Sequence, residues 1–191
     1  MFDGGIDSSS SGLLATPTPG APNASLAYQG LVETPITTPE HGFHDTPFLV
    51  TVTNVTPGAT IRYTLDGSEP KESSAVYTGP ITISGTTCFR VRAFMAGWKP
   101  SFSRTDTYIF VNDVVQQPEY DETINGQAMS WGMNQDVVNK TYHDASNQVV
   151  TVQDALKAIP TISITTDYEN LFGPSTGIYV NAAQRWEVPA S

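Results

Sequence analysis

The feature that most constrains the fold is a series of short apolar alternations between residues 48 and 110. Phe48, Val50 and Val52 occupy alternate positions of one segment, and turn-forming residues 54–58 follow it. Later segments repeat the spacing with Ile61, Tyr63 and Leu65; Tyr77, Ile81 and Ile83; Phe89, Val91 and Ala93; and Tyr108 and Phe110. Alternate residues of a strand face the same side of a sheet, so the pattern predicts about six or seven half-buried strands.

Strands spaced about ten residues apart and separated by turn signals favour an all-β fold, an Ig-like antiparallel β-sandwich. We expect Val50, Ile61, Tyr63, Ile83 and Val91 to be buried together between its two sheets. The pair Asp66-Gly67 predicts a turn that uses the freedom of glycine to adopt a positive φ.

Charge excludes some functions without naming a partner. The formal net charge is −10, because nineteen scattered Asp and Glu outnumber nine Lys and Arg. No basic cluster is present to neutralise phosphates, which argues against nucleic-acid binding. The single cysteine, Cys88, gives neither a disulfide framework nor a thiolate metal site, and we interpret it as a small buried hydrophobe.

The flanking sequence is organised differently from the predicted sandwich. Residues 1–30 are rich in Gly, Ser, Thr and Pro and are interpreted as a linker, residues 31–111 as the sandwich, and residues 112–158 as a second linker containing a short helix. The sequence shows neither a signal peptide nor an apolar run long enough for a membrane span, so we expect any export signal to lie on additional sequence.

The sequence of the C-terminal residues, 151–191, predicts an incomplete α+β segment. A helix is expected at residues 151–159, with Thr151 as N-cap, an apolar face formed by Val152, Ala155, Leu156 and Ile159, and Pro160 as the stop. Residues 161–166 and 177–180 are predicted strands. Little sequence follows them, so residues 159–191 are interpreted as the truncated start of another domain.

Three stretches resemble segments of one kind of bacterial multi-domain protein. Residues 58–70, followed by 77–81 and 89–94, resemble the chitobiase/β-hexosaminidase C-terminal module, a fibronectin-type-III-associated or fucosidase-associated β-sandwich. Residues 159–164, 170–172, 177–181 and 185–191 resemble the opening of the CotH-like, kinase-related family. Thr16 to Asn23 is similar to the end of a lamin-tail-like domain.

This resemblance implies a large exported protein, extracellular or on the cell surface, in which neighbouring domains of the same polypeptide are the partners. It implies no catalytic residue in this chain, because the kinase-related family carries its catalytic positions further downstream. The sandwich itself is an accessory without chemistry in enzymes that contain it. No cofactor is implied.

Aromatic residues offer the leading candidate for ligand contact. Tryptophans and tyrosines stack on sugar rings in carbohydrate-binding sandwiches, and the candidates are Trp98, Trp131, Trp186, Tyr63, Tyr77 and Tyr108. The three tyrosines fall at inward strand positions and are assigned to the core. Trp98 lies beside the turn at Gly97 and is the best single ligand contact.

Metal binding is the weaker interpretation of the polar candidates. His41 and His44 are spaced i and i+3 in a loop without a defined third ligand, and His143 is remote in sequence. Asp66, Ser68 and Glu69 bring three oxygen donors to one turn, but their spacing departs from a calcium loop, so a structural Asx turn is favoured and calcium stays open.

No phosphate loop, nucleophile elbow or Cys/His dyad is present, so the leading hypothesis is a non-catalytic accessory or spacer module. Two alternatives remain open. One is a carbohydrate-binding module acting through Trp98. The other is the N-terminal part of a CotH-like kinase whose catalytic region lies downstream.

Overall fold

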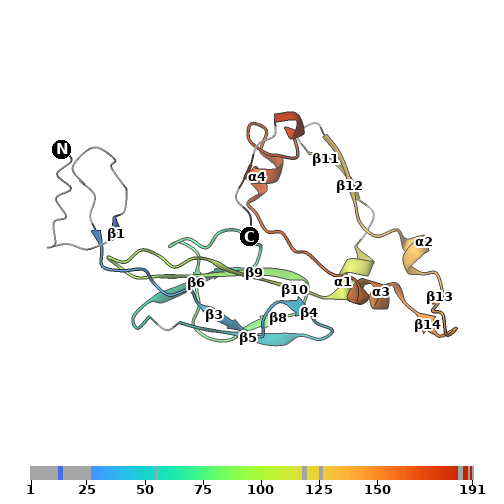
Figure 1. The fold of residues 1–191 in the computed structure, drawn as a ribbon, viewed down its shortest axis with the longest axis horizontal. Helices are drawn as coiled ribbons and strands as arrows, with labels where there is room; N and C mark the ends of the chain where they lie inside the picture. The colour runs from blue at the N-terminus through green and yellow to red at the C-terminus, as the bar shows by residue number, and fades with distance from the viewer. Residues whose placement is uncertain are drawn as a thin grey trace, which may run out of the picture.

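The computed structural model describes residues 13–14, 27–54, 56–117, 120–124, 127–184, 187–188 and 190, and two facing β-sheets form its centre (Figure 1). One sheet has the strand order β4 (Gly42–Phe43), β10 (Arg104–Ile109), β9 (Thr87–Phe94), β6 (Thr60–Thr64) and β7 (Ala75–Val76). The other has the order β3 (Ile36–Thr38), β5 (Phe48–Thr53) and β8 (Ile81–Ile83). The all-β sandwich prediction is confirmed. One pair departs from the expected antiparallel pattern, because β4 runs parallel to β10.

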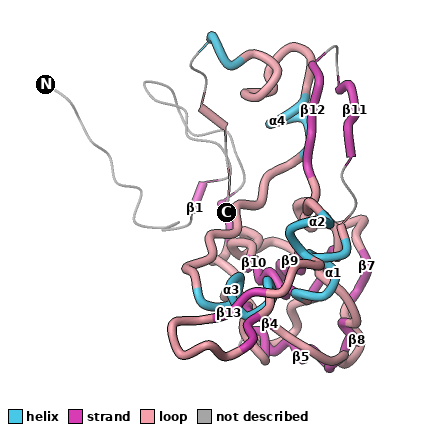
Figure 2. The backbone as a smooth tube through the Cα atoms, turned by 90° about the vertical axis from the view of Figure 1, so that its right-hand side faces the viewer, coloured by secondary structure: helices cyan, strands magenta, loops and turns pink. Residues whose placement is uncertain are grey.

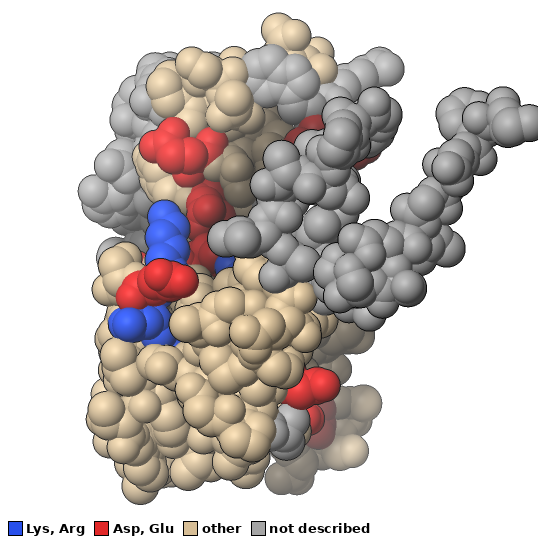
Figure 3. All heavy atoms as spheres, turned by 90° about the vertical axis from the view of Figure 1, so that its left-hand side faces the viewer, with Lys and Arg blue, Asp and Glu red and all other residues tan. Residues whose placement is uncertain are grey.

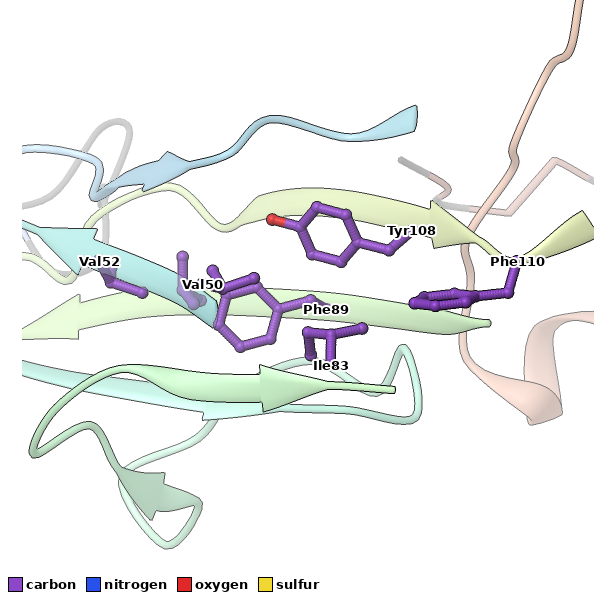
Figure 4. Packing of buried hydrophobic residues seen from close by; sticks show 7 residues of the cluster. Val50, Val52, Ile83, Phe89, Tyr108 and Phe110 are labelled. Atoms are coloured by element: carbon purple, nitrogen blue, oxygen red, sulfur yellow. The ribbon is translucent and has the colours of Figure 1, made fainter. Parts of the chain in front are cut away.

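The predicted alternation places the core between these sheets. In β5, Val50 and Val52 are buried while Leu49, Thr51 and Thr53 are exposed. Val50 and Ile83 of the small sheet meet Phe89 and Tyr108 of the large sheet (Figure 4). Val91 of the large sheet belongs to the same core cluster. Of the five side chains expected in the core, Val50, Ile83 and Val91 are fully buried, and Ile61 and Tyr63 are partly buried against them.

A short helix, α1 (Val111–Gln116), extends the sandwich beyond β10. Its Val111 and Val115 are buried, and Asp113 Oδ2 accepts a hydrogen bond of 2.7 Å from the backbone N–H of Thr86 in the β8–β9 turn. The sequence predicted a linker here, because six residues are too few to show helical periodicity.

The region expected to be a linker contains further regular structure. The elements are β11 (Tyr120–Ile124) paired with β12 (Gln127–Trp131), α2 (Gln135–Val138), β13 (Tyr142–His143) paired with β14 (Val149–Val150), and α3 (Val152–Ala158). Figure 2 shows the β11–β12 hairpin and α4 (Tyr168–Phe172) standing to one side of the sandwich.

The predicted helix at 151–159 is confirmed as α3. Thr151 is its N-cap and forms a capping box with Asp154, in which the Thr151 hydroxyl accepts from the Asp154 N–H and the Asp154 carboxylate accepts from the Thr151 N–H. Ile159 is extended, and Pro160 follows it. The expected apolar face is only half-buried at Val152 and Leu156, and Ala155 and Ile159 are exposed.

The two strands predicted after α3 are wrong. Residues 161–166 have no regular secondary structure and join no β-ladder among the described residues, and residues 178–180 form a turn that folds back on α4. There the Ile178 N–H donates to the Asn170 carbonyl over 2.9 Å. A 3₁₀ helix at Ala182–Gln184 completes this part. Alternation alone makes an extended segment amphipathic, but a strand also requires a neighbour with matching backbone groups.

At the N-terminal side, β1 (Leu13–Leu14) pairs with β2 (Ala27–Tyr28) inside the stretch expected to be a linker. The segment Thr16 to Asn23, which resembles the end of a lamin-tail-like domain, lies outside the described residues. In the described part of the chain, no helix has the length and apolar character needed to cross a bilayer.

Candidate functional site

The outward side of the five-stranded sheet carries polar side chains from its two longest strands, β9 and β10. Phe89, Val91 and Ala93 of β9 point into the core, so Cys88, Arg90 and Arg92 point the opposite way. The antiparallel register sets Thr105 of β10 opposite Arg90 and Thr107 opposite Cys88. These five outward residues, Cys88, Arg90, Arg92, Thr105 and Thr107, are called the outer face.

One end of the outer face is organised by Glu69. Its carboxylate accepts hydrogen bonds from Arg90 Nη2, from Arg92 Nη1 at 3.1 Å and from the Ser103 hydroxyl. Arg90 also donates from Nη1 to the Gly67 carbonyl over 3.1 Å, and its side chain is only 10% exposed. The arginines therefore fix the loop at 66–70 onto the sheet.

The Asp66-Gly67 turn forms as predicted. Asp66 Oδ1 accepts from both the N–H and the hydroxyl of Ser68, and the hydroxyl bond comes first among the causes that lower the pKa of Asp66. Gly67 has φ +78°. Because Asp66 bonds to Ser68 while Glu69 bonds to arginines, the geometry favours the structural turn over the calcium interpretation.

Replacing Glu69 with glutamine tests this network. Glutamine retains the shape but removes the charge that faces two arginines, so we expect the free energy of unfolding to fall by about 2 kcal/mol. Urea denaturation followed by fluorescence measures the change. The exposed Glu72, two residues beyond this loop, provides the control, Glu72→Gln, whose free energy of unfolding is expected to lie within about 0.5 kcal/mol of wild type. Equal stability of the two variants would contradict the assigned role of Glu69.

The other end of the outer face is crossed by residues 161–167, here called the strap. The Ser163 hydroxyl lies 2.6 Å from the Thr107 hydroxyl, and Thr165 Oγ1 lies 3.0 Å from Cys88 Sγ. Thr165 is buried, and a Cβ added to Gly67 would lie 3.1 Å from Thr165 Cγ2. The strap thus packs closely on the sheet through Ser163 and Thr165. The neighbouring side chains of Ile162 and Ile164 are exposed.

Trp98, the predicted ligand contact, lies half-buried at the turn following β9. Hydrogen bonds join the backbone of residues 29–32 to this turn, including Lys99 N–H to the Gly30 carbonyl at 2.8 Å. The indole covers Gly30 so closely that a Cβ there would lie 2.6 Å from Cζ3 of the ring. A ligand role for Trp98 stays a prediction. The side chains of Trp131 and Trp186 lie outside the described part of the structure.

Tyr63, Tyr77, Tyr108 and His44 have structural contacts. Tyr108 is fully buried and donates to the Pro39 carbonyl over 2.8 Å, and Tyr63 and Tyr77 are half-buried against the core cluster. The His44 ring stacks on Phe48 with a centroid distance of 3.8 Å. Within the described residues, no three His, Cys, Asp or Glu side chains are placed to hold a metal ion.

Asp106, which no sequence pattern singled out, is a buried carboxylate. It is 1% exposed and accepts from the Thr37 hydroxyl at 2.5 Å, from Arg104 Nε at 2.9 Å and from the His41 N–H at 3.2 Å. Burial acts to raise the pKa of Asp106, but the bonds from Arg104 and Thr37 outweigh it, and the pKa is lowered. The available signal was an acidic residue at an inward position of β10, two residues before the core residue Tyr108.

Fold and outer face together define the central unit as a β-sandwich module. Residues 39–105 match the family model of the chitobiase/beta-hexosaminidase C-terminal domain, a non-catalytic, carbohydrate-associated β-sandwich. The match spans β4 to β9 and the start of β10, and it confirms the resemblance for this part of the chain. No curated protein matches the chain.

Proposed function

We propose that the sandwich is a non-catalytic accessory module of a larger exported protein, and that its outer face holds the polypeptide that follows it in a fixed position. The observation that carries this proposal is the docking of the strap across β9 and β10. A flexible spacer needs no such contacts, whereas a module that orients its neighbour must bind the connecting chain.

Contacts at three places support a fixed connection. Val111 and Val115 of α1 are buried and anchor the first turn after β10. Lys157 of α3 donates to Asp45 of the sandwich over 2.6 Å, although both side chains are partly exposed and such a pair contributes little alone. Ser163 and Thr165 then bind the strap to the outer face. Several modest contacts spread along one connection restrict its direction more than any single one does.

The neighbours of the module are proposed from the sequence motifs. Residues 159–191 are the start of a CotH-like domain, and residues 1–30 are the tail of a lamin-tail-like domain. In this arrangement the parent protein is extracellular or on the cell surface, and any kinase activity belongs to sequence beyond the sandwich. The family match at residues 39–105 supports the accessory role, because that module is associated with carbohydrate-active enzymes.

A single cysteine substitution tests the docking directly. Cys88 is the only cysteine, and Thr165 Oγ1 lies 3.0 Å from its sulfur. In Thr165→Cys we expect mild oxidation to form an intramolecular disulfide, since two sulfurs at these positions need little movement to bond. Mass spectrometry of the monomer would show a cross-linked peptide pair, and thiol titration would fall to near zero.

The matched control is Ile164→Cys. Ile164 is the adjacent residue, but its side chain is 75% exposed and lies on the opposite side of the strap from Thr165. We expect its thiol to remain free in the monomer under the same oxidation. If Thr165→Cys keeps two free thiols as Ile164→Cys does, the strap does not rest on the outer face and the proposed role is wrong.

A further inference from the structure

A pocket of about 460 Å³ lies between the β4–β10 edge of the sandwich and the strap. Its size falls in the range of pockets that hold small ligands, roughly 300–1,000 Å³. Three elements supply its walls, and the lining residues are His41, Gly42, Phe43, Thr105, Thr107, Ile109, Thr161 and Ser163. The site depends on the docking proposed above, because Thr161 and Ser163 belong to the strap.

One part of the lining is apolar. Phe43 of β4 and Ile109 of β10 are partners in the parallel pair, so their side chains stand side by side on the outward side of the sheet. Phe43 is 36% exposed, and part of its ring is therefore accessible from solvent. This aromatic and aliphatic pair forms an apolar platform.

The rest of the lining carries hydroxyl groups. Thr105 and Thr107 come from β10, and Thr161 and Ser163 face them from the strap. Thr107 and Ser163 share one hydrogen bond of 2.6 Å, but each hydroxyl has one donor and two acceptor positions, so both retain bonding capacity. An entirely apolar ligand would bury the remaining bonding capacity of Thr107 and Ser163 without offering a hydrogen bond, which is unfavourable.

The charge of the lining residues indicates the charge of the ligand. None of the lining residues is Lys, Arg, Asp or Glu, and the imidazole of His41 is the only titratable group among them. The chain as a whole has a formal charge of −10, which repels anions. The pocket chemistry therefore fits a neutral molecule with one apolar face and several hydroxyl groups.

We propose that this pocket binds a neutral saccharide, with a pyranose ring resting on Phe43 and its hydroxyls bonding to the threonine and serine side chains of β10 and the strap. Its apolar ring face and equatorial hydroxyls match the two parts of the lining. The pocket differs from the Trp98 site considered from sequence, where the indole rests on Gly30 and is half-buried.

The test is a titration of the intact chain with neutral trisaccharides of glucose, xylose and N-acetylglucosamine, followed by calorimetry or ligand-observed NMR. We expect at least one to bind, and Phe43→Ala to weaken that binding at least tenfold. Thr105→Val, which keeps the side-chain shape, is expected to weaken it several-fold. Trp98→Ala serves as the aromatic control and is expected to leave affinity within twofold of wild type. Thermal unfolding of each variant confirms that it is folded.

Each outcome decides the proposal. Absence of binding to wild type overturns it, and so does binding that survives both Phe43→Ala and Thr105→Val. If only Trp98→Ala abolishes binding, the saccharide binds at Trp98, and the proposal that it binds in this pocket is wrong. The cross-linked Thr165→Cys protein distinguishes saccharide binding from the docking of the strap. If the disulfide forms but no saccharide binds, the binding proposal is wrong and the docking proposal stands. If the cross-linked protein still binds saccharide, both proposals are supported.

Discussion

Asp106→Ala is expected to lower the free energy of unfolding by about 3 kcal/mol. The carboxylate is 1% exposed and links the two sheets, because it accepts from Thr37 of β3 while belonging to β10. Alanine leaves the Thr37 hydroxyl and the His41 N–H without this partner. It also removes the carboxylate from Arg104, whose side chain is 26% exposed and recovers part of the loss by hydration.

The pH dependence of this effect follows from the lowered pKa of Asp106. A carboxyl whose folded pKa lies below its ordinary value of 3.8 stabilises the protein above that value, and the contribution is lost as pH falls through the folded pKa. We therefore expect the difference between wild type and Asp106→Ala to be constant near neutrality and to shrink below about pH 4. Urea denaturation at a series of pH values measures both quantities.

Glu40→Gln is the matched control for Asp106, since Glu40 also pairs with Arg104. Its side chain is 71% exposed and lies 3.5 Å from the Arg104 guanidinium, so the loss should stay below about 0.5 kcal/mol. A similar effect for both acids, or an Asp106→Ala difference that persists unchanged at pH 2, would show that the buried hydrogen bonds do not carry this stability.

Phe89→Ala is the second large effect, with an expected loss of about 4 kcal/mol. Phe89 is fully buried among the core residues (Figure 4). Its ring centroid lies 5.9 Å from that of Tyr63 and 6.4 Å from that of Tyr108. Alanine leaves a cavity between the sheets that these rigid neighbours cannot fill. The same denaturation experiment measures the loss.

Phe102→Ala is the control for this substitution, because it removes the same side chain from a position that is 68% exposed. We expect a change below about 0.5 kcal/mol. If Phe102→Ala were as destabilising as Phe89→Ala, burial between the two sheets would not be the source of the effect.

The arrangement of charged side chains could be predicted from the sequence only in part. Composition argued against a basic patch, and on the face shown in Figure 3 the basic side chains lie directly beside acidic ones. Composition gave no indication that Arg90 and Arg92 both turn to Glu69, more than twenty residues away in the chain. Such pairings depend on strand register, which is a property of the assembled sheet.

The sequence by itself determined the main sandwich strands β5, β6, β8, β9 and β10 and the core between them, since alternation is a local property that any half-buried strand must show. It also determined the Asp66-Gly67 turn and the capped helix α3, whose bonds join residues within a few positions of each other. These features need no knowledge of distant partners.

Only the tertiary structure decided which polar groups meet. Thr37 and Asp106 are 69 residues apart, and Cys88 and Thr165 are 77 apart, so no local pattern connects them. The strap shows the limit most clearly, because alternation placed Ile162 and Ile164 on one side without saying which side is buried. Packing on a sheet of arginine, threonine and cysteine brought the hydroxyl side inward, since those groups offer hydrogen bonds that an isoleucine side chain cannot make.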